Sequence, residues 1–240
     1  IGVIIPELAH YYFSTVLAGI EQEASSRGYA IMVGQSGESY DREVRLCENF
    51  YEHKVCGVIV SQAKDTLQYD HFKKLIDHDM PLVFYDRICT GINCSRVVVD
   101  DYMGAYNAVS HLIDTGCRRI ACYSSPMTME ISKNRYNGYR DALLKHHLQP
   151  EERFFRICDN RADAKRMGFN VPDDISICGF TNGQRAIACD PMLTTVEQRG
   201  NMVGEEAANI LINKVEGLSP KEKVEKRVVR TRLVIRGTTR

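Results

Sequence analysis

The sequence predicts an α/β protein built from parallel sheets with helices on both faces. The first observation behind this prediction is that short apolar runs alternate with helical stripes along the chain. The second is the segment Lys165–Phe180, in which a helix end, a tight connection and a short buried strand follow one another. With 240 residues, the chain is long enough to bury a large core and to form two lobes.

The segment Lys165–Phe180 carries the strongest local signal. Gly168 can take the left-handed conformation that closes a helix, and Pro172 cannot continue one. The apolar run 175–178 is typical of a parallel strand that is covered on both faces. Because open α/β sheets bind ligands at the carboxyl ends of their strands, residues 179–183 are expected to approach a site.

The remaining elements follow from the spacing of apolar residues and from Gly and Pro. Strands are expected over residues 1–5, 29–33, 55–60, 82–85, 97–99, 119–124 and 228–235, with another near 154–158. Helical stripes are carried by Val16–Ala24, by Val44–Tyr51, by Phe72–Ile76, by Ala105–Ile113, by Tyr136–Leu143 and by Val203–Leu211.

One stretch is too short for this alternation. Few residues lie between the strand near Phe154–Cys158 and the helix that ends at Met167. A regular unit needs more residues there. We therefore expect a segment of roughly 30 residues, the size of one βα unit, to be missing near residues 160–165.

Composition narrows the class of protein. Lys+Arg and Asp+Glu balance at 31 each, so no overall charge draws this chain to nucleic acid. Nine cysteines, an odd number without a Cys-x-x-Cys pair, favour buried thiols in a reducing compartment over metal or redox use. The sequence has no leader and no apolar run long enough to cross a bilayer, and we expect a cytoplasmic protein or a trimmed domain.

Motifs for catalysis are missing. The sequence contains no Gly-x-Ser-x-Gly elbow, no phosphate-binding loop, no Gly-x-Gly-x-x-Gly and no His-Glu-x-x-His. The adjacent pair His146-His147 is expected at a solvated helix end rather than at a metal. The prediction is a binding protein with no catalytic residues, no metal and no cofactor.

Polar and aromatic residues instead gather where strands end. Carboxylates accept hydroxyl hydrogen bonds, Arg donates in a rigid fork, and an aromatic ring covers an apolar ring face, so such a set suits a sugar, a sugar acid or a nucleobase. The candidate binding residues are Tyr12, Phe13, Asp86, Asp100, Arg135, Thr181 and Gln198.

Two of these choices depend on local arguments. Tyr12 and Phe13 are adjacent, and two neighbouring aromatics are not expected to share one buried helix face, so at least one should line a cleft. Arg135 is expected at the start of a helix, where the dipole disfavours a cation. It is therefore placed either for a ligand or carboxylate, or in a surface or structural salt bridge, and the sequence leaves both open.

Several segments resemble the effector-binding domain of LacI/GalR-type transcriptional regulators. The resemblance is most specific at Lys165–Phe180 and at Ser132–Tyr139, which keeps a Ser-x-x-Arg-x-x-Gly-Tyr pattern around Arg135. It extends over Ile1–Ala24, Val83–Gly91, Val97–Gly116, Ser132–Leu143, Leu193–Gln198 and Leu233–Thr239.

The resemblance implies a periplasmic-binding-protein-like (type I) fold, with two Rossmann-like lobes and three crossings between them. The lobes are expected at residues 1–99 with 199–223, and at residues 100–198 with 224–240. By resemblance, the candidate residues line an effector cleft between the lobes. Thr181 departs from the pattern, because relatives usually have Asp there, and this weakens the case for a simple neutral sugar.

By the same resemblance, the chain is the ligand-sensing and dimerisation domain of a bacterial regulator, a repressor, that binds operator DNA through an N-terminal helix-turn-helix outside this sequence. Effector binding would shift the balance between two lobe arrangements of a homodimer. Two alternatives remain open: an extracytoplasmic sugar-binding protein of a transporter, which the cysteines disfavour, and an enzyme on the same scaffold.

Overall fold

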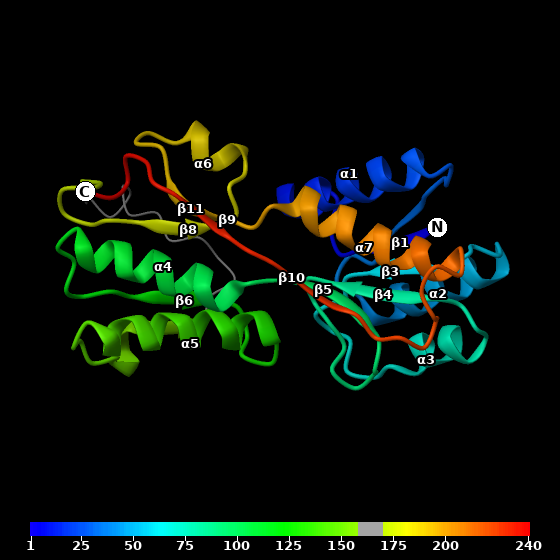
Figure 1. Cartoon of the computed structure of the whole chain (residues 1–240). Helices are drawn as coiled ribbons and strands as arrows, with labels where there is room; N and C mark the ends of the chain where they lie inside the picture. Colours follow the sequence, from blue (N-terminus) through cyan, green and yellow to red (C-terminus); the bar gives the residue numbers. More distant parts are fainter. Residues whose placement is uncertain (158–169) are drawn as a thin grey trace. The chain divides into compact units, whose positions relative to one another are not determined.

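The computed structural model describes residues 1–157 and 170–240 (Figure 1). The chain divides into two compact units: unit 1 contains Ile1–Val99 and Arg199–Val229, and unit 2 contains Asp100–Gln198 and Arg230–Arg240. The expected helix end at Gly168 and the missing segment near residues 160–165 lie outside the described residues.

Unit 1 is a parallel sheet with helices on both faces. Its strands occur in the order β10-β5-β4-β3-β1-β2, and every neighbouring pair is parallel. The strands are β1 (Gly2–Ile5), β2 (Met32–Gln35), β3 (Val58–Val60), β4 (Leu82–Tyr85), β5 (Ser95–Val99) and β10 (Lys226–Val229), and the helices are α1 (Tyr11–Ser26), α2 (Tyr40–Glu52), α3 (Asp70–Asp77) and α7 (Gly200–Val215).

Side chains of alternate strand residues pack on opposite faces of this sheet. Val3 and Ile5 of β1 belong to the core cluster that contains the buried residues of α1 and α7. Ile4 belongs to a second cluster with buried residues of α2 and α3. Burial on both sides explains why these strands are continuously apolar in sequence.

Glycines allow α1 and α7 to pack closely. A Cβ on Gly204 would lie 2.1 Å from the carbonyl oxygen of Val16, and a Cβ on Gly19 would lie 2.1 Å from that of Asn201. The two helix backbones therefore approach more closely than side chains permit, and α7 covers one side of α1.

Unit 2 is built around smaller sheets. One has the order β11-β9-β8, and the other pairs β6 with β7. Helices α4 and α5 share a core cluster that includes Val109, Leu112 and Tyr139. The strands are β6 (Cys122–Ser124), β7 (Phe155–Ile157), β8 (Cys178–Phe180), β9 (Thr194–Glu197) and β11 (Arg232–Val234), the helices are α4 (Asp101–Asp114), α5 (Glu130–Lys145) and α6 (Gln184–Ala188), and residues Glu152–Phe154 form a 3-10 turn.

The C-terminal part of the chain differs from the prediction. The single strand expected over 228–235 is two strands, because the chain leaves unit 1 after Val229. β10 pairs with β5 of unit 1, so unit 2 resumes at Arg230 and not at residue 224. β11 pairs antiparallel with β9, which contradicts the expectation of wholly parallel sheets. The polar residues Arg230, Thr231 and Arg232 separate two apolar runs at the crossing, and the prediction had included them in one strand.

Other differences are local. β2 begins at Met32, three residues after the expected start, and the short helix α6 was not predicted. Over residues 1–157 and 170–240, no helix is long and apolar enough to cross a membrane.

Candidate functional site

Tyr12 and Phe13 lie in the first turn of α1, which follows the carboxyl end of β1. Both side chains are buried, each 4% exposed, and their ring centroids are 5.5 Å apart. Both belong to the core cluster of unit 1, which contradicts the argument that two neighbouring aromatics would not share a buried helix face. That at least one of them lines a cleft stays a prediction. Because both the sheet and α7 cover α1, its buried arc is wide enough for two consecutive residues, whose side chains point about 100° apart.

Asp86 follows β4 directly and is buried, with a backbone φ of +57°. Its amide donates to the carbonyl of Val97 at 3.1 Å. The next residue, Arg87, binds both carboxyl oxygens of Glu38 through Nη1, at 2.7 and 2.6 Å. The Arg87 guanidinium also lies over the Phe13 ring, 5.4 Å from its centroid. The residue next to Asp86 is therefore fixed both to Glu38, just before α2, and to Phe13 of α1.

The residues after β3 add polar groups that were missed in the sequence. Ser61 is fully buried, and its hydroxyl has no hydrogen-bond partner among the described residues. The same holds for the buried Oε1 of Gln62, whose Nε2 donates to the carbonyl of Thr66 at 2.8 Å. The sequence signal was present, because both residues directly follow the apolar run of a predicted strand. Such buried partnerless groups are rare and require an explanation.

In unit 2, Arg135 is held between a carboxyl group and an aromatic ring. Its Nε donates to Asp101 Oδ1 at 2.7 Å, and its guanidinium carbon lies 4.1 Å from the centroid of Phe180. Arg135 is not at the helix start as predicted, because α5 begins at Glu130. The pair with Asp101, which is only 3% exposed, fits both interpretations that were left open, a carboxylate partner and a structural salt bridge. Asp101 and Phe180 were not among the predicted site residues.

Asp100 has a structural task in this conformation. Its side chain caps α4 by accepting a hydrogen bond from the amide of Met103 at 3.1 Å. The neighbouring Asp101 is the residue that meets Arg135. Any contact of Asp100 with a ligand stays a prediction.

Thr181 and Gln198 come together at the carboxyl ends of β8 and β9. Thr181 Oγ1 donates to Gln198 Oε1 at 2.8 Å, and Gln198 is 5% exposed. Thr181 has a φ of +79°, which is unusual for a β-branched residue and is typical of strain kept at functional positions. Thr181 and Gln198 thus lie together at the carboxyl ends of two neighbouring parallel strands of unit 2.

The chemistry available at these positions is recognition by hydrogen bonds and ring contacts. Burial raises the pKa of the Cys122 thiol to about 11 and the pKa of the Cys178 thiol to about 12, so both stay protonated at neutral pH. The described residues contain no group of three or more His, Cys, Asp and Glu side chains that could hold a metal ion.

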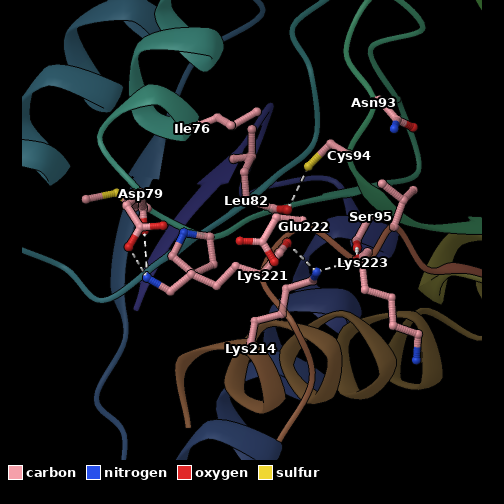
Figure 2. A pocket seen from close by; sticks show the side chains of 13 residues that line it. Ile76, Asp79, Leu82, Asn93, Cys94, Ser95, Lys214, Lys221, Glu222 and Lys223 are labelled. Atoms are coloured by element: carbon pink, nitrogen blue, oxygen red, sulfur yellow. Dashed lines mark hydrogen bonds and ion pairs between the residues drawn. The ribbon is translucent and has the colours of Figure 1, made fainter. Parts of the chain in front are cut away.

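The amino edge of the unit 1 sheet holds a separate cavity of about 240 Å³ (Figure 2). The ammonium of Lys214 donates to the carbonyls of Pro220 at 3.2 Å, Lys221 at 2.8 Å and Lys223. Cys94 Sγ donates to the carbonyl of Leu82 at 2.7 Å. None of the seven predicted binding residues lines this cavity.

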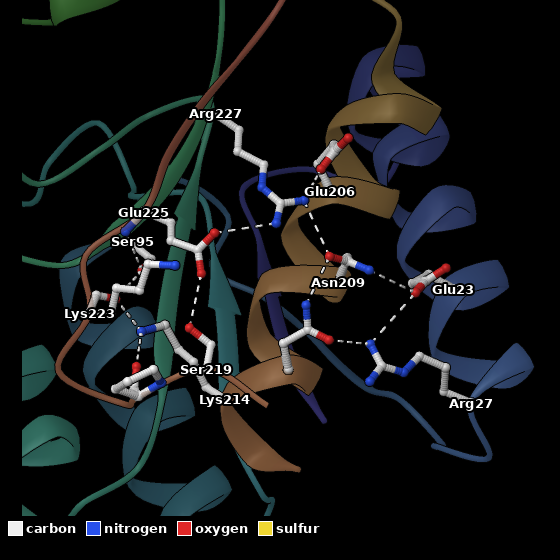
Figure 3. A network of polar contacts seen from close by, with 12 residues as sticks. Glu23, Arg27, Ser95, Glu206, Asn209, Lys214, Ser219, Lys223, Glu225 and Arg227 are labelled. Atoms are coloured by element: carbon white, nitrogen blue, oxygen red, sulfur yellow. Dashed lines mark hydrogen bonds and ion pairs between the residues drawn. The ribbon is translucent and has the colours of Figure 1, made fainter. Parts of the chain in front are cut away.

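A polar network beside this cavity ties α7 to α1 and β10 (Figure 3). Arg227 of β10 binds Glu206 and Asn209 of α7. Asn209 donates in turn to Glu23 of α1 at 3.4 Å, and Arg27, which directly follows α1, donates to Asn213 at 2.9 Å. These groups satisfy one another within the fold.

Comparison with known proteins places this fold in a class. A family model described as periplasmic binding proteins and sugar binding domain of the LacI family matches residues 1–170. A second model, described as a periplasmic binding protein-like domain, matches residues 161–239. The chain therefore belongs to the family of periplasmic binding proteins and LacI-type sugar-binding domains.

Individual relatives narrow the class. The HTH-type transcriptional repressor CytR of Escherichia coli K12 is 26% identical over 271 aligned positions, covering 99% of this chain and 78% of CytR. A putative ribose operon repressor from Burkholderia thailandensis matches with a TM-score of 0.87 and 23% identity, over 97% of both chains. The transcriptional regulator CelR in complex with cellobiose matches with a TM-score of 0.88 and 22% identity, over 99% of this chain and 83% of CelR.

These relatives are transcriptional regulators. They identify the chain as the ligand-binding domain of a LacI-type regulator and set aside the transport-protein alternative. The fold prediction, a periplasmic-binding-protein-like α/β protein, is confirmed.

Proposed function

We propose that this domain binds a small-molecule effector, which is a sugar, a sugar derivative or a nucleobase, and thereby controls operator binding by a homodimeric repressor. The observation that carries the proposal is the fixed guanidinium of Arg135, stacked on Phe180 and paired with Asp101. A guanidinium held in one plane can direct hydrogen bonds at hydroxyl or carbonyl oxygens without losing further side-chain entropy.

The other proposed effector contacts are the predicted residues together with Ser61 and Gln62. In unit 1 these are Tyr12, Phe13 and Asp86, and in unit 2 they are Asp100, Thr181 and Gln198. The support is their position at the carboxyl ends of strands, where α/β proteins bind ligands. The cellobiose complex of CelR supports the sugar class, since CelR shares this fold.

Control of DNA is the second part of the proposal. CytR carries an HTH-type name, and its alignment leaves 22% of its length beyond the matched region, which is room for a DNA-binding segment. Effector binding changes DNA affinity only if the effector has different affinities for two conformations of the dimer. Exposed Met32 and Val33 on the edge strand β2 support pairing with a second copy.

We also propose that the domain does not catalyse a reaction and that it acts in the reducing cytoplasm. The regulators among its relatives and the protonated buried thiols support the first statement. Eight cysteines of the described residues are free thiols, which supports the second.

Thermal unfolding in the presence of D-ribose, cellobiose, D-gluconate and adenine tests the effector class. A compound at one hundred times its dissociation constant should raise the free energy of unfolding by about 2.7 kcal/mol. Arg135→Ala should abolish this increase, measured against the unliganded variant, because the stacked guanidinium is lost.

Arg140→Ala is the matched control, since Arg140 lies on the same helix and pairs with its neighbour Asp141. This variant should keep the full ligand effect. An undiminished ligand effect in Arg135→Ala contradicts the proposed binding residues, and no effect of any of the four compounds on the wild type contradicts the proposed effector class.

A further inference from the structure

Glu43 is a buried polar residue that none of the functional assignments uses. It lies in the first turn and a half of α2 and has no exposed surface. Its Oε2 accepts a hydrogen bond from the amide of Ala63 at 2.7 Å. Its Oε1 accepts one from the hydroxyl of Thr66 at 2.6 Å and lies 3.0 Å from His71 Nε2.

Two of these three partners lie in the connection between β3 and α3, residues 61–69, which we call the β3 loop. Ala63 and Thr66 are 1% and 2% exposed, so the bonds are shielded from water. His71, 5% exposed, belongs to the start of α3, which continues from this loop. One carboxyl group therefore anchors the middle and the end of the β3 loop to α2.

A second carboxyl group holds the adjacent amide. Glu38 Oε2 accepts from the amide of Lys64 at 3.0 Å, and the same Glu38 binds Arg87. The backbone amide of Gln62 donates to the backbone carbonyl of Arg87 at 3.1 Å. The β3 loop is thus tied both to the start of α2 and to the residue that follows Asp86.

Burial of a carboxyl group is costly unless donors surround it, and an apolar residue at this position would pack without that cost. What the arrangement provides is one fixed loop conformation. The loop begins with Ser61 and Gln62, whose buried Oγ and Oε1 atoms have no partner among the described residues. Fixing the loop fixes the direction of these two groups before a ligand arrives.

We infer that Glu43 is a positioning residue for ligand binding, which acts by holding the β3 loop so that Ser61 and Gln62 face the effector. The ligand-binding role that this inference gives to Ser61 and Gln62 rests on the proposed effector function. The anchoring of the loop itself is independent of any ligand.

The test combines hydrogen exchange with ligand affinity, in the wild type and Glu43→Gln. The Gln side chain keeps the size of Glu but turns an amide group toward one of the donors. The substitution should also speed up exchange throughout the protein, because it lowers the global free energy of unfolding. The amides of residues 61–69 should exchange at least about tenfold faster than this global change predicts. The compound of the four-compound panel with the largest thermal effect should bind roughly tenfold more weakly.

Lys214→Met is the matched control. It also removes a buried side chain that holds a loop through several hydrogen bonds, but at the amino edge of the same sheet. This variant should lower the melting temperature and leave both the exchange of residues 61–69 and the ligand affinity unchanged. If Glu43→Gln fails to fold, Thr66→Val removes one donor only and should show smaller changes in the same direction.

The outcomes separate the two proposals. If the amides of residues 61–69 in Glu43→Gln exchange faster only by the amount that the change in global stability predicts, Glu43 does not anchor the loop. Faster local exchange with unchanged affinity overturns the positioning role and leaves the effector function standing. If no panel compound binds the wild type, the effector class fails, and the exchange result alone decides whether Glu43 anchors the loop.

Discussion

The two edges of the unit 1 sheet hold their loops in opposite ways. At the carboxyl edge, Glu43 and Glu38 gather the N–H and O–H donors of the β3 loop. At the amino edge, the ammonium of Lys214 gathers three carbonyl oxygens of the segment that leads into β10 (Figure 2). At each edge a buried charged side chain, Glu43 or Lys214, supplies hydrogen bonds that an irregular loop lacks.

The edges differ in what remains unsatisfied. At the amino edge, the network around Arg227 and Asn209 joins donors to acceptors (Figure 3). At the carboxyl edge, Ser61 Oγ and Gln62 Oε1 are buried without a partner among the described residues. Buried polar groups normally find partners, so these two oxygen atoms support the proposed ligand contacts at the carboxyl edge. The amino edge also has a buried atom without a partner among the described residues, the Nε of Arg96 at the start of β5.

The largest expected effect is on stability, at the amino edge. Lys214→Met leaves three carbonyl oxygens without their donor in a site where Lys214 is 3% exposed. We expect the free energy of unfolding to fall by about 3 kcal/mol, measured by urea denaturation. Effector affinity should not change.

Lys221→Met provides the comparison, because Lys221 is exposed and its ion pair with Asp79 is open to water. The free energy of unfolding of Lys221→Met should fall by no more than about 0.5 kcal/mol. Equal losses for the two lysine variants would contradict the structural role assigned to Lys214.

The second effect is on affinity, at the carboxyl edge. Ser61→Ala removes a hydroxyl that has no partner within the described residues, so the free energy of unfolding should change by less than about 0.5 kcal/mol. Effector affinity, measured by calorimetry, should fall about tenfold through loss of one hydrogen bond.

Ser110→Ala is its control. The Ser110 hydroxyl is also buried and has no partner among the residues that the structure describes, but Ser110 lies within α4 and does not directly follow a strand. The effector affinity of Ser110→Ala should equal that of the wild type. If both serine variants bind the effector as the wild type does, a partnerless hydroxyl at the carboxyl edge has no bearing on ligand binding.

This contrast between edges could be predicted only in part from the sequence. Apolar runs located the strands, and the rule that ligands meet their carboxyl ends led to Asp86, Thr181 and Gln198. The same rule applies to Ser61 and Gln62, which were overlooked because they carry no charge or ring. Residues that directly follow a strand can be located from the local sequence pattern alone.

Other features depend on contacts between distant residues. The burial of both Tyr12 and Phe13 requires α7, which begins nearly 200 residues later. Asp100 and Asp101 are adjacent and chemically identical, yet one caps α4 and the other meets Arg135. Which residue takes which task depends on the backbone direction at the start of α4. No spacing rule distinguishes them.

The smallest expected effect is a pH dependence at the amino edge, where Cys94 lies beside Leu82. Burial raises the pKa of the Cys94 thiol from 9.0 to about 12. Between these values, the unfolded chain loses a proton that the folded chain keeps, so this contribution to stability is complete below pH 9 and declines as the pH rises toward 12.

The expected slope is at most about 1.4 kcal/mol per pH unit. Urea denaturation of the wild type and of Cys94→Ala at pH 8 and pH 10 isolates the contribution of Cys94, because the other titrating groups are common to both proteins. The difference between their free energies of unfolding should shift by about 1 kcal/mol against the wild type between the two pH values. A constant difference would mean that water reaches the thiol, and the amino edge would then be open to solvent and to ligands as well.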